Sequence, residues 1–343
     1  MKRIIFITAL SFVVLSVLQG QDQYRSKYPD IPIVDVHIHP QGVNDLANFI
    51  KVSDGIKQKY GSNLAFWIGV SKPLDPIPDV KAAGNNRILF AVAGFRAQRG
   101  FRDGGINFTA EEVIEKVKND GFVGLKFSFS GGGGRHLEVG EAGITEIDDP
   151  RLAPFFSKLE KAGVVMTSLH TADPNGPFDN RQNWMKDPVY FWEQTRSFEN
   201  ILINYPNLTV IAAHGAWLTC QDAQYDYLRY MLATYPNFYV DICATDSYMH
   251  LSNRDNIRDF YIEYQDRLIF GTDGGRVPND AIENHVDRYA KFFALLETDQ
   301  IINGGFFGNA PTKGLDLPRE VLEKIYYKNA LKLYPGLQQA MGL

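Results

Sequence analysis

IVDVHIH, residues 33–39, is a short β-branched run in which polar and aliphatic side chains alternate. Successive side chains of a strand point to opposite faces, so Asp35, His37 and His39 should share one face, and Val36 and Ile38 the other. We therefore expect a strand that directs a carboxylate and two imidazoles inward and its aliphatic side chains toward packed helices. A His-x-His pair alone also occurs on exposed strands that bind nothing, so its meaning depends on the rest of the chain.

Seven further runs of this kind follow, separated by stretches with helical spacing. They are LAFWIGV (64–70), RILFAVAGF (87–95), GFVGLKFS (121–128), VVMTSLH (164–170), LTVIAAH (208–214), FYVDIC (238–243) and RLIFGTD (267–273). Repeated β–α units predict a parallel sheet, and eight of them predict an α/β fold closed into a (β/α)8 TIM barrel. An open doubly wound sheet is the competing fold. It normally carries a Gly-rich phosphate turn after its first strand, and HIHPQG at 37–42 is not one.

The composition is that of one ordinary globular domain. The chain has 343 residues, of which 45% are hydrophobic and 22% are charged. This length fits two average domains or one barrel with insertions, and no linker or low-complexity tract divides residues 21–343. We therefore expect one barrel domain over 21–343. The longest irregular stretch, 171–195, is expected to form a lid or binding loop at the top of the barrel.

The first 20 residues have the order of a secretory signal peptide. Lys2 and Arg3 precede an apolar run that ends near Gly20. The run is short for a membrane span of roughly 20 residues, although an uncleaved anchor stays open. We expect cleavage, export to the periplasm or the medium, and no stable membrane association afterwards. Removal of the two basic residues changes the formal charge from −5 to −7, which argues against a nucleic-acid partner.

The chain has two cysteines, Cys220 and Cys243, too few for a disulfide framework. They could pair in an oxidising compartment, but two buried free thiols are the simpler expectation.

Polar residues collect at the carboxyl ends of the predicted strands. Four of the seven histidines and one aspartate lie there: His37, His39, His170, His214 and Asp273. In a (β/α)8 barrel these strand ends form the active-site face. Imidazole nitrogens and carboxylate oxygens suit zinc and similar first-row ions, so the joint pattern predicts a divalent metal site. Such a site, if it keeps one position open, can bind and activate a water molecule.

These pieces resemble the amidohydrolase superfamily, within it the amidohydrolase-2 branch of hydrolases, lactonases and decarboxylases. The matching motifs are IVDVHIHP, SLHTADP, AAHGAW and RLIFGTD, and the resemblance covers residues 31–336. It implies that His37, His39, His170 and Asp273 hold the metal, one Zn²⁺ or alternatively Mn²⁺. It also implies that Asp273 shuttles protons and that His214 orients or deprotonates the attacking water.

Lys126, on the fourth predicted strand, has three interpretations. It could be a cation that faces the substrate, a structural lysine, or a carbamate that bridges two metals as in other branches of the family. The resemblance to a one-metal branch favours the first.

Further side chains near strand ends could line the substrate pocket. The candidate cations for an acidic substrate are Arg96, Arg99, Arg135 and Arg276, and the candidate walls are Trp184, Trp192 and Trp217. Asp241 could hydrogen-bond a group behind the metal ligands or serve in packing. The remaining histidines, His136, His250 and His285, fit no ligand position and are expected on the surface or in loops.

The predicted function is metal-dependent hydrolysis of an ester, lactone or amide bond in a small, acidic molecule. A non-oxidative decarboxylase of an unsaturated or aromatic acid is the alternative from the same branch. A non-catalytic binding protein is the third class, and it would be expected to have lost a ligand. A homo-oligomer is left open.

Overall fold

The computed structural model describes residues 24–93, 101–102, 105–106, 108–129, 146–175 and 187–343. The predicted signal peptide, 1–20, lies outside these residues. So do five of the side chains singled out above: Arg96, Arg99, Arg135, His136 and Trp184.

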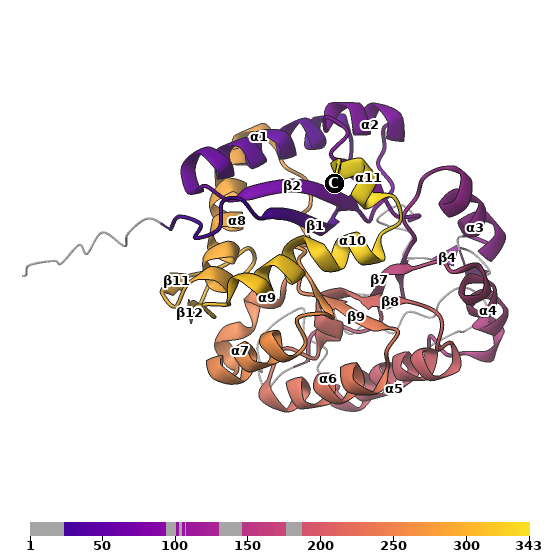
Figure 1. The fold of residues 1–343 in the computed structure, drawn as a ribbon. Helices are drawn as coiled ribbons and strands as arrows, with labels where there is room; N and C mark the ends of the chain where they lie inside the picture. Colours follow the sequence, from indigo (N-terminus) through magenta and orange to yellow (C-terminus); the bar gives the residue numbers. More distant parts are fainter. Residues whose placement is uncertain (1–23, 94–100, 103–104, 107, 130–145, 176–186) are drawn as a thin grey trace, which may run out of the picture.

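Eight parallel strands form the centre of the molecule, one from each predicted run (Figure 1). They are β1 (Pro32–Ile38), β2 (Asn63–Gly69), β3 (Ile88–Phe90), β6 (Leu125–Ser128), β7 (Met166–His170), β8 (Val210–Ala212), β9 (Phe238–Asp241) and β10 (Leu268–Ile269). Strand β10 ends well before residue 273, so Asp273 lies on the loop that follows it and not on the strand.

The strands close into a ring. Strands β1, β2 and β3 pair in one sheet, and β6 to β10 pair in a second. Two parallel bridges join the sheets, one between Ile38 and Gly274 and the other between Val92 and Leu125. The predicted (β/α)8 barrel is therefore confirmed.

Helices surround this ring (Figure 1). The longer ones are α1 (Val43–Tyr60), α2 (Ile77–Ala83), α3 (Ala110–Asn119), α4 (Ala153–Ala162), α5 (Pro188–Asn204), α6 (Asp222–Thr234), α7 (Arg254–Glu263) and α8 (Ile282–Glu297). The C-terminal ones are α9 (Arg319–Glu323), α10 (Asn329–Leu333) and α11 (Leu337–Met341). Helix α1 packs beside α8, so the helix after the first strand and the helix after the last strand are neighbours.

The prediction of an irregular stretch over 171–195 is wrong at its C-terminal end. Helix α5 begins at Pro188, because the side chain of Asp187 accepts hydrogen bonds from the backbone N–H groups of Val189 and Tyr190. Trp192 consequently lies on this helix, packs edge-on against Tyr227 of α6, and does not wall the predicted site.

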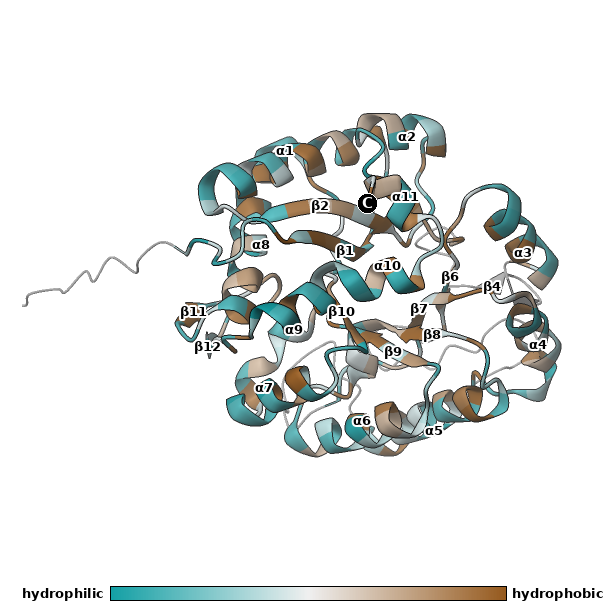
Figure 2. Ribbon diagram, viewed as in Figure 1, coloured by the Kyte–Doolittle hydropathy of each residue, from teal (hydrophilic) through white to brown (hydrophobic). Residues whose placement is uncertain are grey.

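Two apolar layers hold the barrel together. The larger lies between the strands and the surrounding helices. The smaller fills the ring with residues that lie on the strands or directly beside their ends, and it includes Leu333, Tyr334 and Leu337 from the C-terminal segment. Figure 2 shows the strands largely brown, whereas the surrounding helices alternate between teal and brown. The C-terminal helices thus close the end of the barrel opposite the predicted site.

Strand β1 departs from simple alternation. Val36 belongs to the inner apolar layer, whereas Asp35 hydrogen-bonds the hydroxyl of Tyr289 on the outer helix α8 (2.6 Å). The pairing register shifts between Asp35 and Ile38. Over this stretch β1 contains one residue more than the paired stretch of β2. Such a bulge places two consecutive residues on one face. The expectation that Asp35 points inward and Val36 outward is therefore wrong, while His37 and His39 still face the interior.

No helix in the described part of the chain is long and apolar enough to cross a membrane. Two short antiparallel pairs lie outside the barrel: β4 (Phe101–Arg102) with β5 (Gly105–Ile106), and β11 (Ile301–Asn303) with β12 (Pro311–Lys313).

His285 is not a surface histidine. It lies on α8, its side chain is buried, and its Nδ1 has no hydrogen-bond partner among the described residues. Burial lowers the pKa of His285 to about 4, with the nearby Arg288 acting in the same direction and Asp45 against it.

This depressed pKa predicts a pH-dependent stability. The unfolded chain takes up a proton at His285 near its ordinary pKa of about 6.5 and the folded chain does not, so the free energy of unfolding should fall as the pH drops from about 6.5 to about 4. His285→Gln should flatten the pH dependence over this window in urea titrations. His250→Gln, on a partly exposed turn, serves as the control and should keep the wild-type slope. An unchanged slope in His285→Gln would contradict the assignment.

Candidate active site

The predicted site residues converge at the carboxyl end of the barrel. His37 and His39 come from the end of β1, and His170 ends β7. His214 follows β8, and Asp273 follows β10. The first and last strands are neighbours in the ring, which brings His39 and Asp273 together although 234 positions separate them.

His37, His39 and Asp273 form a compact set of donor atoms. Oδ1 of Asp273 lies 2.9 Å from Nε2 of His39 and 3.4 Å from Nε2 of His37. All three atoms lie within 4.8 Å of one another. Tetrahedral zinc with bonds of roughly 2.0–2.1 Å places neighbouring ligand atoms about 3.3 Å apart, so this set fits such an ion.

The charge states of the set also suit a divalent cation. Burial works to raise the pKa of Asp273, but the hydrogen bond from His39 and the charges of the surrounding histidines outweigh it and hold the pKa well below its usual range. Burial lowers the pKa of His39 to about 4, against the opposing effect of Asp273. Near pH 7 the set therefore offers an ionised carboxylate and a neutral imidazole. Nδ1 of His39 is buried and has no hydrogen-bond partner among the described residues.

His170 lies beside this set but is held by another partner. Nε1 of Trp217 donates a hydrogen bond to Nε2 of His170 (3.1 Å). The rings of His170 and His214 are 4.9 Å apart, centroid to centroid, so His170 stands at the same end of the barrel. A metal bound through Nε2 of His170 would have to replace the indole N–H.

Lys126 is brought into the site by β6. Its ammonium group donates to Oγ of Ser168 (2.7 Å) and lies 3.3 Å from Nε2 of His37, which can accept from it. Burial lowers the pKa of Lys126, while the charges of Asp273 and Asp241 act to raise it. The lysine therefore contacts a predicted metal ligand directly, a contact that sequence reasoning did not anticipate.

His214 sits on a left-handed turn. The residues from His214 to Trp217 all have φ values between 55° and 60°. This conformation costs roughly 1–2 kcal/mol for each residue other than glycine, so the surrounding structure must hold it in place. The turn stacks the indole of Trp217 on the imidazole of His214, with ring centroids 4.2 Å apart. Trp217 thus contacts both His170 and His214, in agreement with its predicted place in the site.

A second layer of polar groups lies behind the histidines. Oδ2 of Asp241, on β9, is 2.8 Å from Nδ1 of His37, and Oδ1 of Asp241 accepts from the backbone N–H of His214 (2.8 Å). Burial works to raise the pKa of Asp241, but the adjacent His37 outweighs it and lowers the pKa to about 2. Asp241 is therefore ionised and orients His37, which resolves its role between the two predicted alternatives.

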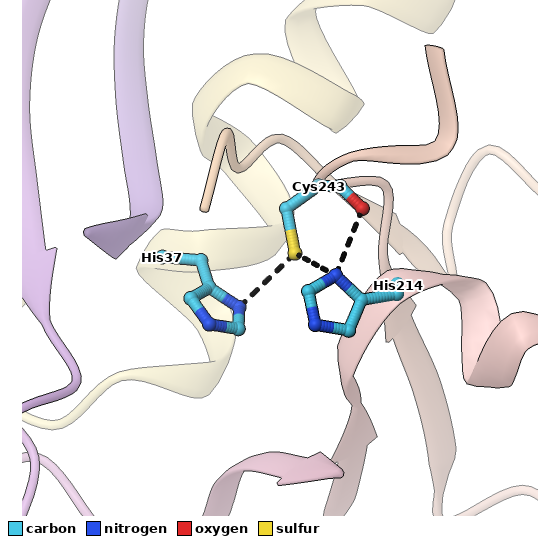
Figure 3. A group of neighbouring side chains, drawn as sticks. All are labelled: His37, His214 and Cys243. Carbon is cyan, nitrogen blue, oxygen red and sulfur yellow. Dashed lines mark hydrogen bonds between the residues drawn. The ribbon is translucent and has the colours of Figure 1, made fainter. Parts of the chain in front are cut away.

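Cys243 completes this layer. Figure 3 shows its sulfur between the rings of His37 and His214, 3.1 Å from Nδ1 of each. These three donor atoms form a second group that could hold a metal. From the sequence, Cys243 was expected only to be a buried thiol. The one available signal was its spacing, since it follows Asp241 by two residues as His39 follows His37. Both cysteines are buried thiols, as expected.

Of the four predicted arginines, the described residues include one. Arg276 is exposed on the loop after β10 and forms no hydrogen bond or ion pair with the described site residues. Its predicted role in substrate binding receives no support from these contacts, and Arg96 and Arg135 lie outside the described residues.

Three solved structures illustrate what the fold resembles. An uncharacterised TIM-barrel protein from Bordetella bronchiseptica has 15% identity and a TM-score of 0.51, and the match covers 91% of this chain and all of that one. An IDCase from Metarhizium anisopliae has 13% identity and a TM-score of 0.43, covering 90% and 98% of the two chains. An amidohydrolase from Burkholderia multivorans, solved with bound zinc, has 13% identity and a TM-score of 0.42, covering 88% and 98%. The first of these supports the barrel fold.

Comparison with curated proteins found no match. A family model described as amidohydrolase matches residues 34–336, which is most of the chain and includes the site residues described above. The chain therefore belongs to this amidohydrolase family.

Proposed function

We propose that the chain is a metal-dependent hydrolase that cleaves an ester, lactone or amide bond of a small, acidic molecule. The observation that carries this proposal is the compact set of His37, His39 and Asp273 beside the neutral imidazole of His214. We propose His170 as the fourth protein ligand and one divalent ion, Zn²⁺ or Mn²⁺, as the cofactor. A bound ion of this kind polarises a carbonyl group and lowers the pKa of water.

The protein's own residues are suited to hold and move the proton. Asp273 is ionised and its side chain is partly exposed, so it can orient water at the mouth of the barrel, and we propose it as the acceptor of that water's proton. Burial lowers the pKa of His214 well below its ordinary value, so its imidazole is neutral at pH 7 and offers a lone pair that can orient the attacking water. His214 is held against Trp217 and the backbone of β9, which fixes its direction.

A decarboxylase is the second candidate, and Lys126 is compatible with it. A buried ammonium group next to the predicted ligands is suited to bind a substrate carboxylate. The same cation would bind the acid group of a hydrolase substrate, so Lys126 supports an acidic substrate in both cases. The products of the reaction distinguish the two.

We also propose that residues 1–20 direct export, so that the substrate is met outside the cytoplasm. The basic and then apolar order of these residues supports this, and N-terminal sequencing of the exported protein tests it.

The first prediction concerns Asp273. Asp273→Asn removes the proton acceptor and one predicted ligand charge, so turnover of a lactone, ester or amide substrate should fall by about 10²-fold or more. Asp266→Asn, an exposed aspartate paired with Lys324, is the matched control and should retain wild-type turnover. Substrates are screened in ¹⁸O-labelled water with analysis of products and of carbon dioxide. Label in a product carboxylate supports hydrolysis, whereas carbon dioxide without a hydrolysed bond would establish the decarboxylase instead.

The second prediction concerns Trp217. Because its indole N–H occupies Nε2 of His170, binding of Zn²⁺ at His170 should displace the indole and change its fluorescence. The change in fluorescence should persist in Trp192→Phe, which removes a tryptophan of α5, and it should disappear in Trp217→Phe. An equal change in Trp217→Phe, or no change in wild type at saturating zinc, would argue against His170 as a ligand through this nitrogen.

A further inference from the structure

The sulfur of Cys243 makes three polar contacts in the layer behind the site. It donates to Oδ1 of Asp241 (2.7 Å) and lies 3.1 Å from Nδ1 of both His37 and His214 (Figure 3). All four side chains are buried. One sulfur atom thus contacts two imidazoles from different strands and the carboxylate that serves one of them.

The donors and acceptors around His214 determine which of its ring nitrogens carries hydrogen. Nδ1 of His214 faces the backbone oxygen of Cys243 (3.2 Å) as well as its sulfur. A carbonyl oxygen can only accept, and the single thiol hydrogen is directed to Asp241. The hydrogen between the ring and these acceptors must therefore belong to Nδ1. A neutral His214 is then left with an unprotonated Nε2.

The same argument applies to His37. Its Nδ1 faces the carboxylate of Asp241, which is an acceptor when ionised, and its Nε2 faces the ammonium group of Lys126, which is a donor. The contact with Asp241 (2.8 Å) is shorter than the one between Nε2 and Oδ1 of Asp273 (3.4 Å), so a neutral His37 carries its hydrogen on Nδ1 and leaves a lone pair on Nε2. His37 and His214 therefore share one tautomer, and each has its unprotonated Nε2 on the side away from Cys243.

We propose that Cys243 is a positioning residue whose side chain holds the rings of His37 and His214 in this orientation. The proposal rests on the proposed metal site, because the nitrogen left unprotonated on His37 is the one that lies next to Asp273. Cys243 contacts the Nδ1 side of both rings, whereas Nε2 of His37 faces Asp273, and so the proposal makes it a positioning residue and not a ligand. Residues that orient ligands in this way typically change metal affinity by about 10–100-fold when they are replaced.

The polarity of the thiol, and not only its volume, is required. Oδ1 of Asp241 accepts hydrogen bonds from the backbone N–H groups of His214 (2.8 Å) and Cys243 (3.3 Å) and from the thiol. An apolar side chain of similar size would fill the space between the rings but would remove the thiol donor and the acceptor that both imidazoles share. A serine hydroxyl would keep both the donor and the acceptor, although its C–O bond is shorter than the C–S bond of cysteine.

Three variants of the full chain separate these roles. Cys243→Val keeps the volume without the polarity, and Cys243→Ser keeps the polarity. Cys220→Val is the matched control, because it changes the other buried thiol. The backbone N–H of Cys220 donates to the side chain of Gln224, and no imidazole of the site is involved in this bond. Zinc affinity is measured by competition with a chromophoric chelator. Thermal unfolding of each variant establishes that it is folded.

We expect Cys243→Val to bind zinc about 10–100-fold more weakly than wild type, and Cys243→Ser and Cys220→Val to lie within about threefold of it. Equal weakening in the valine and serine variants would reduce the role to packing and overturn the proposal. So would wild-type affinity in Cys243→Val. A thiolate-to-metal absorption band in the cobalt-substituted wild type that Cys243→Ser abolishes would make Cys243 a ligand and overturn it as well.

Long-range ¹H–¹⁵N spectra of the metal-free protein provide a readout that does not depend on metal. Wild type should show hydrogen on Nδ1 of both His37 and His214. Cys243→Val should keep these tautomers, because Asp241 and the backbone oxygen of residue 243 still accept from the two rings, and it should shift the ring resonances of His214 that report its orientation. Hydrogen on Nε2 of either ring in wild type would contradict the proposal. If wild type shows the expected tautomers but binds no zinc, the proposed function fails while the positioning role stands.

Discussion

The site depends on one junction, where β1 meets the chain that follows β10, and a buried carboxylate holds it. Oδ1 of Asp35 accepts from the backbone N–H groups of His37 (3.1 Å) and Thr272 (3.0 Å), and its Oδ2 accepts from the hydroxyls of Thr272 and Tyr289 (2.6 Å each). These four hydrogen bonds tie the strand that carries His37 to the loop that carries Asp273. Burial raises the pKa of Asp35 to about 6, so the hydrogen bonds offset a substantial desolvation cost.

The bulge in β1 gives this junction its form. Without the extra residue, alternation would send Asp35 and His37 to the same face, and a carboxylate that reaches Tyr289 on the outer helix layer would carry His37 outward with it. The bulge reverses the alternation between the two residues. The carboxylate can then brace the barrel from outside while the imidazole enters the site from inside.

Inside the barrel, hydrogen bonds orient the imidazole rings of the site. The nitrogen lone pairs that could bind a cation therefore already have fixed directions. Lys126 and Trp217 direct N–H groups at Nε2 of His37 and of His170. Asp241 and Cys243 hold the opposite edges of His37 and His214. A cation on the front edge of these rings would meet unprotonated nitrogens backed by a negative carboxylate, an arrangement typical of metal-binding histidines.

Periodicity predicted the barrel, and the position of five site residues at the ends of the runs predicted that they meet at one end of it. Eight β-branched runs separated by helical stretches determine the ring, and the position of a histidine at the end of a run determines its face. The bulge at Asp35 was not predictable, because it depends on the pairing of β1 with β2 and leaves no mark in the alternation of IVDVHIH. The role of Cys243 and the contact of Lys126 with His37 depend on distances across the barrel, 206 and 89 positions apart in the chain. His285 and Trp192 were misplaced because a helix, not a loop, carries each of them.

The most direct test of the account is the metal content of the purified chain by elemental analysis. It is compared with that of the His37→Ala/His39→Ala double variant and of His250→Ala, a histidine on a turn outside the site. We expect about one divalent ion per chain in wild type and His250→Ala and none in the double variant. About two ions per chain would instead require a further ligand such as modified Lys126. No metal in any of the three proteins after reconstitution with zinc and manganese would contradict the account, since the same residues would then have to act as a metal-free acid–base site.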